Sequence, residues 1–290
     1  GAGRRRERGG AHMRLIPAAA VTDCVRRLCL AANRRLPPEA EAALRRAARE
    51  EPWPAAAGTL DELCRNLDAA RETGLPICQD TGLVTVFAEL GEGARVEDFE
   101  EAVQEGVRRG YAEGHLRKSV VRDPLRRGNT GDNTPAGIYL RLVPGESLRL
   151  TVAPKGAGSE NMCAVRMLTP AEGEEGVRAF VLETLRRAGG KPCPPVVVGL
   201  GLGGSFDSVP RLAKEALLRP LGQPNGDEFY ARLERELLEE INSLGIGPQG
   251  LGGRTTALAV HIKPAPTHIA MLPAAVCLSC HALRHATEVI

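Results

Sequence analysis

The stretch Leu75-Pro-Ile-Cys-Gln-Asp-Thr-Gly82 brings a thiol, an amide, a carboxylate and a hydroxyl together in four consecutive residues, Cys78 to Thr81. A proline and a glycine bracket these residues, which predicts a fixed turn or loop rather than the interior of a helix. Cys78 can ligate a metal, Asp80 can transfer a proton, and Gln79 can orient a substrate. The rest of the chain is therefore expected to fold around this loop.

Helices are predicted before the loop. Ala-rich and Leu-rich runs from Ala18 onward carry Arg and Glu at helical spacing, and prolines break them at 37–38 and 52–54. Three cysteines on these helices are expected to be small buried hydrophobic residues: Cys24, Cys29 and Cys64.

Strands and helices alternate after the loop. The patterns predict strands at 83–90, 136–143, 148–153, 194–200, 255–262 and 267–272, and helices at 96–110, 170–187, 206–218 and 227–244. Short turns between them predict an α/β, mixed α+β fold, with a helical N-terminal segment and a mixed-sheet body, as one domain over 13–290. Loops rich in Gly, Asn, Ser and Thr are expected to present N–H groups to an anion, at 128–135, 155–161, 199–205 and 245–253.

Composition excludes several classes of function. Aromatic residues make up only 3% of the 290, too few for a surface that stacks single-stranded nucleic acid. Residues 1–12 hold four Arg and one Glu, so the remaining residues carry a net charge of −1 and no basic field for DNA or RNA. Residues 1–12 are expected to be a disordered tail or an expression scar, with Met13 as the natural start. No run approaches the ~20 apolar residues of a membrane span.

Eight cysteines without a secretory signal favour the reducing cytoplasm and metal binding over disulfides. Cys193 lies between two prolines, which favours a rigidly held ligand over a core thiol. Cys277 and Cys280 could form a zinc site with His281 and His285 if this segment were helical, as in a zinc-stabilised binding protein. The Gly199-Leu-Gly-Leu-Gly-Gly204 stretch matches G-x-G-x-x-G after a buried strand, which leaves an NAD-dependent oxidoreductase as a further alternative.

Five motifs in one order carry a family resemblance over Met13 to Ile290. They are Ile-Cys-Gln-Asp-Thr-Gly from 77, Gly-Asn-Thr-Gly-Asp-Asn-Thr-Pro-Ala from 128, Pro-Lys-Gly-Ala-Gly-Ser-Glu-Asn-Met from 154, Pro-Cys-Pro-Pro from 192, and Pro-Thr-His-Ile-Ala with Ser-Cys-His-Ala-Leu-Arg-His-Ala at the C-terminal end. Together they resemble the alpha subunit of a class I, iron–sulfur fumarate hydratase, and of its relative L-tartrate dehydratase.

The resemblance implies a [4Fe–4S] cluster held by Cys78, Cys193 and Cys280. Three thiolates leave one iron open, so the cluster can act as a Lewis acid. Asp80 is the implied proton-transfer group, and His268 matches the active-site histidine of the family.

Substrate contacts are implied for Gln79 and Arg117, since a dicarboxylate suits a forked cation. The loop with Gly156 and Gly158 would donate N–H groups to a carboxylate, although Ala157 stands where the family has glycine. Cys277 is a second departure from the family pattern, either a bystander or an alternative ligand.

The resemblance also implies a partner. One-chain relatives carry a second domain that completes the site, and the motifs here end just after the third cysteine. We therefore expect a separate beta subunit, a homodimer or α2β2 assembly, and little activity from this chain alone. The expected reaction interconverts fumarate and L-malate, with L-tartrate dehydration as the alternative.

Overall fold

The computed structural model describes residues 13–290, which form two compact units. Unit 1 contains the described residues up to Ala32, together with Thr81–Pro154 and His285–Ile290; unit 2 contains Asn33–Asp80 and Lys155–Arg284. The predicted tail at residues 1–12 lies outside the described residues. One domain over 13–290 stays a prediction, and each unit is described by itself.

Unit 1 is a mixed sheet with helices on one face. Its four-stranded sheet has the order β10-β5-β2-β4, with β2 and β4 parallel and β10 and β5 antiparallel; β1 and β3 form a separate parallel pair. The elements are β1 (Arg14–Ile16), α1 (Ala18–Arg34), β2 (Leu83–Gly91), β3 (Ala94–Val96), α4 (Phe99–Glu113), β4 (Gly137–Val143), β5 (Leu148–Lys155) and β10 (Ala286–Val289).

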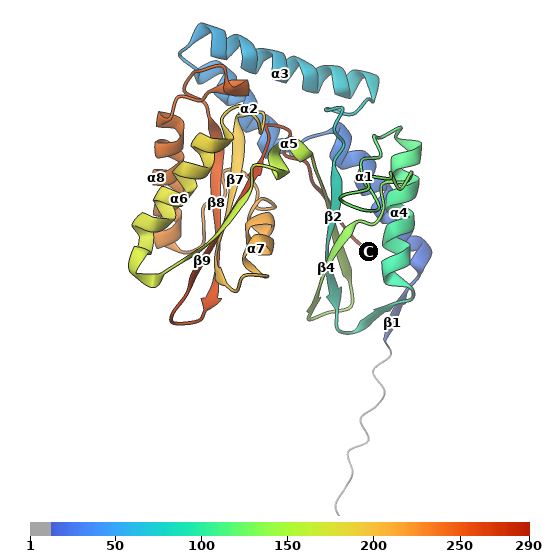
Figure 1. Cartoon of the computed structure of the whole chain (residues 1–290). Helices are drawn as coiled ribbons and strands as arrows, with labels where there is room; N and C mark the ends of the chain where they lie inside the picture. Colours follow the sequence, from blue (N-terminus) through green and yellow to red (C-terminus); the bar gives the residue numbers. More distant parts are fainter. Residues whose placement is uncertain (1–12) are drawn as a thin grey trace, which may run out of the picture. The chain divides into compact units, whose positions relative to one another are not determined.

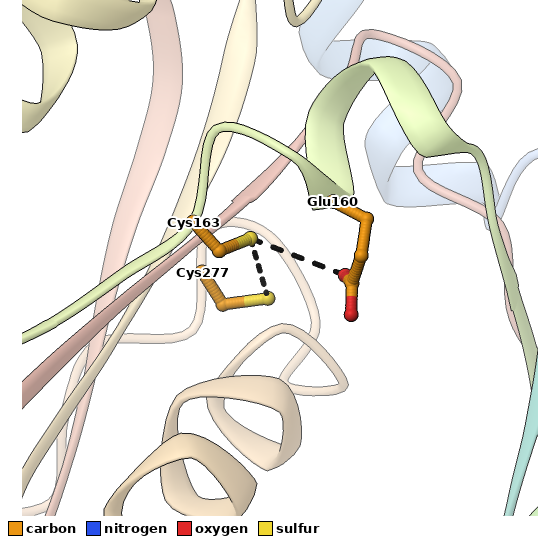
Figure 2. Close-up of side chains that lie close together, drawn as sticks. All are labelled: Glu160, Cys163 and Cys277. Carbon is orange, nitrogen blue, oxygen red and sulfur yellow. Dashed lines mark hydrogen bonds between the residues drawn. The ribbon is translucent and has the colours of Figure 1, made fainter. Parts of the chain in front are cut away.

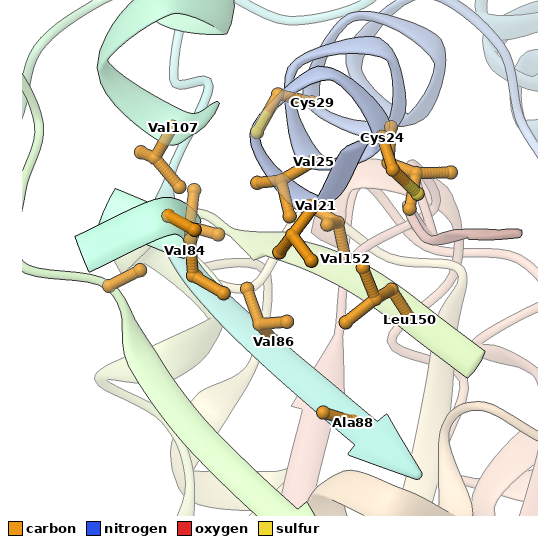
Figure 3. Packing of buried hydrophobic residues seen from close by; sticks show 14 of the residues in the cluster. Val21, Cys24, Val25, Cys29, Val84, Val86, Ala88, Val107, Leu150 and Val152 are labelled. Atoms are coloured by element: carbon orange, nitrogen blue, oxygen red, sulfur yellow. The ribbon is translucent and has the colours of Figure 1, made fainter. Parts of the chain in front are cut away.

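The core of unit 1 lies between α1, α4 and the sheet, as Figure 3 shows for Val21, Val84 and their neighbours. The two helices approach closely because α4 has a glycine at the contact: a Cβ on Gly106 would lie 2.6 Å from Cβ of Val25. Cys24 and Cys29 are fully buried in this core, which confirms the expectation for these two thiols.

Unit 2 is a sheet covered on both faces. Its order is β6-β9-β7-β8, with β7 and β8 parallel and β9 antiparallel to both β6 and β7. The elements are α2 (Pro38–Glu50), α3 (Pro54–Thr73), α5 (Ala157–Glu160), β6 (Ala164–Leu168), η1 (Pro170–Glu172), α6 (Gly173–Ala188), β7 (Val196–Gly204), α7 (Val209–Ala216), α8 (Glu228–Ser243), η2 (Pro248–Gly250), β8 (Ala257–Thr267) and β9 (Leu272–Ser279).

Alternate residues of β7 serve two separate cores. Its even-numbered residues, such as Val198, pack with α6 and α8, whereas Val197 faces α7, α2 and α3. Figure 1 shows α6 and α8 on one side of β7–β9 and α7 on the other. Cys64 is 7% exposed in the second of these cores, so the expectation for it is also confirmed.

The G-x-G-x-x-G stretch is part of this helix–sheet contact. Residues 199–204 belong to β7, so the predicted loop at 199–205 is wrong for most of its length. A Cβ on Gly199 would lie 2.2 Å from the carbonyl oxygen of Ala213, and one on Gly201 would lie 2.4 Å from that of Val209. These glycines let α7 lie against the strand, and the motif does not form the strand-to-helix turn that an NAD site needs.

The predicted helices before the loop are confirmed, with breaks at the expected prolines. The loop predicted at 155–161 contains the short helix α5. The strand predicted at 267–272 is wrong in position: residues 268–271 form the turn, and β9 follows it. Among residues 13–290, no helix is long and apolar enough to cross a membrane.

Candidate functional site

The Leu75–Gly82 stretch is a loop, as predicted, and the part of it in unit 2 is tied down by two asparagines. The backbone N–H of Ile77 donates to the carbonyl of Asn33 at 2.9 Å. The side-chain amide of Asn66 on α3 donates to the carbonyl of Ile77 at 2.8 Å. Ile77 itself is 6% exposed, so it anchors the loop immediately before Cys78.

Cys193 and Cys280 meet at one edge of the unit 2 sheet. Cys193 comes shortly before β7, and Cys280 comes directly after the antiparallel strand β9, whose Ser279 pairs with Val197. The backbone N–H of His281 donates to the carbonyl of Cys193 at 3.2 Å. Residues 87 positions apart in sequence are therefore neighbours in the fold.

Cys78 shares the surroundings of these two thiols. Burial raises the pKa of the Cys193 thiol, and the nearby sulfurs of Cys280 and Cys78 raise it further. Burial also raises the pKa of Cys280, while the positive charge of Arg284 opposes this effect. None of the three is a fully buried core residue, since Cys78 and Cys280 are partly exposed and Cys193 is exposed. Three accessible thiols of this kind fit the donor set of an iron–sulfur cluster, whose ligands are thiolates.

Asp80 lies against the start of α5. The N–H of Ala157 donates to Oδ2 of Asp80 at 2.8 Å. A Cβ on Gly156 would lie 2.9 Å from the same oxygen, so only glycine allows this close approach. The carboxylate is therefore held in a fixed orientation, two residues after Cys78. One N–H group of the predicted carboxylate-binding loop is thus used by Asp80 itself.

Arg284 supplies a buried positive charge at this place. It is 4% exposed, and its Nη1 donates to the carbonyl of Asp80 at 2.7 Å and to Oδ1 of Asn33 at 3.2 Å. Its Nε is buried and has no hydrogen-bond partner within residues 13–290. A buried cation is costly unless negative charge lies nearby, and the Cys280 thiol, on which the charge of Arg284 acts, can provide such charge as a thiolate.

The other predicted site residues lie in different places. Gln79 is exposed beside Cys78, and Gly158 lies within α5. Arg117 is exposed in unit 1, where its carbonyl accepts from Oγ1 of Thr81 at 3.0 Å. His268 is exposed in the turn between β8 and β9, where its Nδ1 accepts from the N–H of Ala270 at 3.1 Å.

His268 lies at the far end of the sheet from Cys193 and Cys280. The strand residue before it, Thr267, pairs with Gly204 at the C-terminal end of β7, whereas the two cysteines flank the opposite end. Eight strand steps of about 3.3 Å separate the two ends by roughly 26 Å. A single copy of unit 2 therefore does not bring His268 to the three thiols.

The four residues of the zinc alternative do not form a site. The segment from 280 to 285 is not helical, so His281 and His285 do not share a helix face. Cys277 on β9 instead contacts Cys163, with 3.6 Å between the sulfurs (Figure 2). Within residues 13–290, the group with metal-ligand spacing is Glu160, Cys163 and Cys277, whose ligand atoms all lie within 4.8 Å of one another.

Two of the residues at these sites were missed by sequence reasoning. Arg284 falls inside the quoted C-terminal motif, and an arginine next to Leu283, four positions after the predicted ligand Cys280, was the available signal. Cys163 follows the Ser-Glu-Asn-Met run directly and carries no local signal. The one related signal in the sequence was Cys277 itself, a cysteine that departs from the family pattern and whose neighbour in the fold is Cys163.

Comparisons with known proteins agree with the motifs. A family model described as fumarate hydratase (Fumerase) matches residues 22–289. A Methanocaldococcus jannaschii protein provisionally named L(+)-tartrate dehydratase subunit alpha is 44% identical over 279 residues, which cover 92% of this chain and 96% of that protein. The L(+)-tartrate dehydratase subunit alpha of Escherichia coli strain K12 is 32% identical over 230 residues, which cover 78% of this chain and 76% of that protein.

Proposed function

The chain belongs to the class I, iron–sulfur fumarate hydratase and tartrate dehydratase alpha-subunit family, and from this membership we propose that it hydrates fumarate to L-malate as the alpha subunit of a hydro-lyase. The observation that carries the proposal is that Cys78, Cys193 and Cys280 lie near one another, with Arg284 acting on Cys280 and donating to the backbone carbonyl of Asp80. A carboxylate and a buried cation beside three accessible thiols suit addition of water to a small diacid.

Cys78, Cys193 and Cys280 are the residues that would hold a [4Fe–4S] cluster. When bound, such a cluster supplies a Lewis-acidic iron for the hydroxyl and carboxylate of the substrate, because three thiolates leave a fourth iron without a protein ligand. Arg284 would balance part of the negative charge of the ligand thiolates, since its charge already acts on Cys280.

Asp80 is the group that we assign to proton transfer. Its carboxylate is partly exposed and is held by the N–H of Ala157, so one oxygen is fixed while the group stays within reach of a ligand. Gln79 follows Cys78 directly and is exposed, which suits an orienting contact. Gly156 would keep the space beside Asp80 open, and Gly158 lies two residues further on, within α5.

The roles of Arg117 and His268 rest on the family resemblance. Arg117 is exposed, so its guanidinium is accessible to a ligand and suits the distal carboxylate of a diacid. His268 would have to serve a site on a neighbouring subunit, because it lies at the far end of the unit 2 sheet.

We further propose a beta subunit as partner, and assembly of two such pairs. The support is the words "subunit alpha" in the names of the relatives. We place the protein in the cytoplasm because the cysteines of residues 13–290 are not paired in disulfides, as is usual in a reducing compartment.

L-tartrate dehydration is the second candidate. The similar proteins from Methanocaldococcus jannaschii and Escherichia coli K12 carry tartrate dehydratase names, whereas the family model is described by fumarate hydratase. Both substrates are four-carbon diacids, so the same cation and carboxylate suit either one.

The decisive experiment mixes the anaerobically loaded chain with its beta subunit and measures turnover of fumarate and of L-tartrate in parallel. We expect fumarate hydration to exceed tartrate dehydration, and either subunit alone to show little activity. Faster tartrate turnover would transfer the assignment to the second candidate. No turnover of either diacid with a loaded cluster would reject the hydro-lyase assignment.

A further inference from the structure

Cys163 and Cys277 are cross-strand neighbours outside the three-cysteine site. The register of β6 and β9 pairs Ala164 with Val276, so Cys163 stands opposite Cys277 one residue beyond the ladder. Their sulfurs are 3.6 Å apart, and Figure 2 shows both side chains pointing toward each other and toward Glu160. Directly opposite residues of an antiparallel pair have Cβ atoms about 4.5–5.5 Å apart, close to the about 3.5–4.5 Å of a disulfide. Rotation about χ1 moves the sulfurs, and a small backbone shift would let them close from 3.6 Å to the bond length of about 2.05 Å.

Two lysines surround this pair of thiols. Nζ of Lys155 lies 3.0 Å from Oε2 of Glu160 and 3.8 Å from Sγ of Cys163. Nζ of Lys214 lies 2.7 Å from the other carboxylate oxygen of Glu160. These ammonium groups already neutralise the negative charge that a metal cation would need. The charge distribution therefore favours a stabilised thiolate over a metal centre.

The two thiols differ in reactivity. Hydrogen bonding to Cys277 and the charge of Lys155, with the N–H of Leu278, lower the pKa of Cys163 to about 7 despite its burial. The same contact raises the pKa of Cys277, which is 3% exposed. Cys163 is partly exposed. By contrast, burial raises the pKa of Cys29 to about 12.

We propose that Cys163 and Cys277 form a redox-active dithiol, in which the accessible Cys163 attacks a small-molecule disulfide and the buried Cys277 resolves the product. In the first step the Cys163 thiolate bonds to one sulfur of the reagent, the reagent's S–S bond breaks, and one thiolate leaves and takes up a proton. In the second step Cys277 loses its proton to solvent and attacks Sγ of Cys163, which releases the second thiol. Two protein thiols are oxidised and the reagent is reduced to two thiols.

Formation of the mixed disulfide on Cys163 favours ionisation of Cys277, which the second step requires. Once Cys163 is capped, it no longer carries the negative charge that opposes ionisation of Cys277, while Lys155 still favours a thiolate there. Lys155 is the last residue of β5, two positions before Ala157, whose N–H donates to Asp80. The disulfide would thus join the end of α5 to β9, next to the loop that orients Asp80.

The test uses the purified chain under argon with oxidised glutathione, at neutral pH. Free thiols are then blocked with N-ethylmaleimide, and peptide mass spectrometry assigns each of the eight cysteines. We expect a cross-linked pair of peptides containing Cys163 and Cys277. The variant Cys277→Ser should stop with glutathione on Cys163, and Cys163→Ser should leave Cys277 unmodified. Lys155→Met should slow modification of Cys163 by on the order of 10-fold.

Cys64→Ser is the matched control, because Cys64 is a buried thiol outside the pair. It should leave the rate of cross-linking unchanged. The proposal is overturned if Cys163 reacts no faster than Cys64, or if Cys163 takes up glutathione in the unchanged chain without forming the cross-link. Protection of both thiols by one equivalent of Zn²⁺ would also overturn it in favour of a metal site. No substrate or beta subunit is used, so the result is independent of the proposed hydro-lyase activity.

Discussion

At the scale of single residues, Asp80 combines a fixed orientation with exposure. Asp80→Asn keeps an oxygen that can accept from the N–H of Ala157, so the loop should keep its conformation. It removes the ionisable group, and we expect kcat to fall by about 10²–10⁴-fold, the usual contribution of a general acid or base. Turnover is measured anaerobically with the beta subunit, and iron content is measured in the same samples.

Asp123→Asn is the matched control for this variant. Asp123 also accepts backbone N–H groups, from Leu125 and Arg126, and an asparagine oxygen can replace it. The control should keep full activity. Full activity in Asp80→Asn with unchanged iron content would remove Asp80 from the mechanism.

A second single residue, the buried Arg284, is expected to stabilise the fold through its hydrogen bonds. Arg284→Met keeps the length of the side chain and removes the donors to Asp80 and Asn33. Loss of two hydrogen bonds from a buried cation should lower the free energy of unfolding by about 2–4 kcal/mol. Urea unfolding measures this, with Arg126→Met as control, because the Arg126 side chain is 89% exposed. An equal, small effect in both variants would show that Arg284 does not support the site.

At the scale of elements, glycine determines how α7 meets β7. Gly201→Ala places a Cβ 2.4 Å from the carbonyl oxygen of Val209 and 2.8 Å from the backbone nitrogen of Ala213. Backbone atoms cannot move aside cheaply, so we expect a loss of about 1–3 kcal/mol in the free energy of unfolding. Gly58→Ala on α3 meets nothing within 4 Å and should gain about 0.5–1 kcal/mol. Denaturation midpoints that move in the same direction for both variants would contradict this.

The elements that the sequence predicts best are those whose ends are marked by residues that break a helix locally, such as proline. The breaks between α1, α2 and α3 follow from prolines at 37–38 and 52–54, which act on their own neighbours. Strands β8 and β9 were misplaced for a physical reason. Pro264 and Pro266 lie in the part of β8 beyond the predicted strand, which is possible because β8 is an edge strand, where proline is tolerated. Residues 272–279 are buried almost throughout and show no alternation.

In the candidate site, too, features that depend on neighbouring residues could be predicted from the sequence, whereas contacts between distant residues could not. The loop at 75–82 could be predicted from Pro76 and Gly82, because both act locally. The neighbourhood of Cys193 and Cys280 depends on the antiparallel pairing of β7 and β9, which no local pattern encodes, so only the family resemblance suggested it. The contact of Arg284 with Asn33 joins residues 251 positions apart. Such a contact exists only after unit 2 has folded.

At the scale of the whole molecule, the cysteines fall into three kinds of environment. Cys24 is fully buried in the core of unit 1, Cys163 and Cys277 form a facing pair, and Cys78, Cys193 and Cys280 share an accessible site in unit 2. A cluster bound at the last site would link three distant segments of unit 2. Because a group that binds only the folded state stabilises it, cluster loading should raise the unfolding temperature of the chain.

This leads to a test of which thiols hold the cluster. Cys78→Ser and Cys193→Ser should abolish iron and sulfide retention, together with the gain in unfolding temperature, because a serine hydroxyl replaces a thiolate ligand. Cys24→Ser should retain both, since Cys24 is fully buried among Val21 and its neighbours in the core of unit 1. Iron and sulfide are measured on protein purified without air. Equal iron content in all three variants would show that the cluster is held elsewhere, and loss of iron in Cys163→Ser or Cys277→Ser alone would move the ligand set to the pair on β6 and β9.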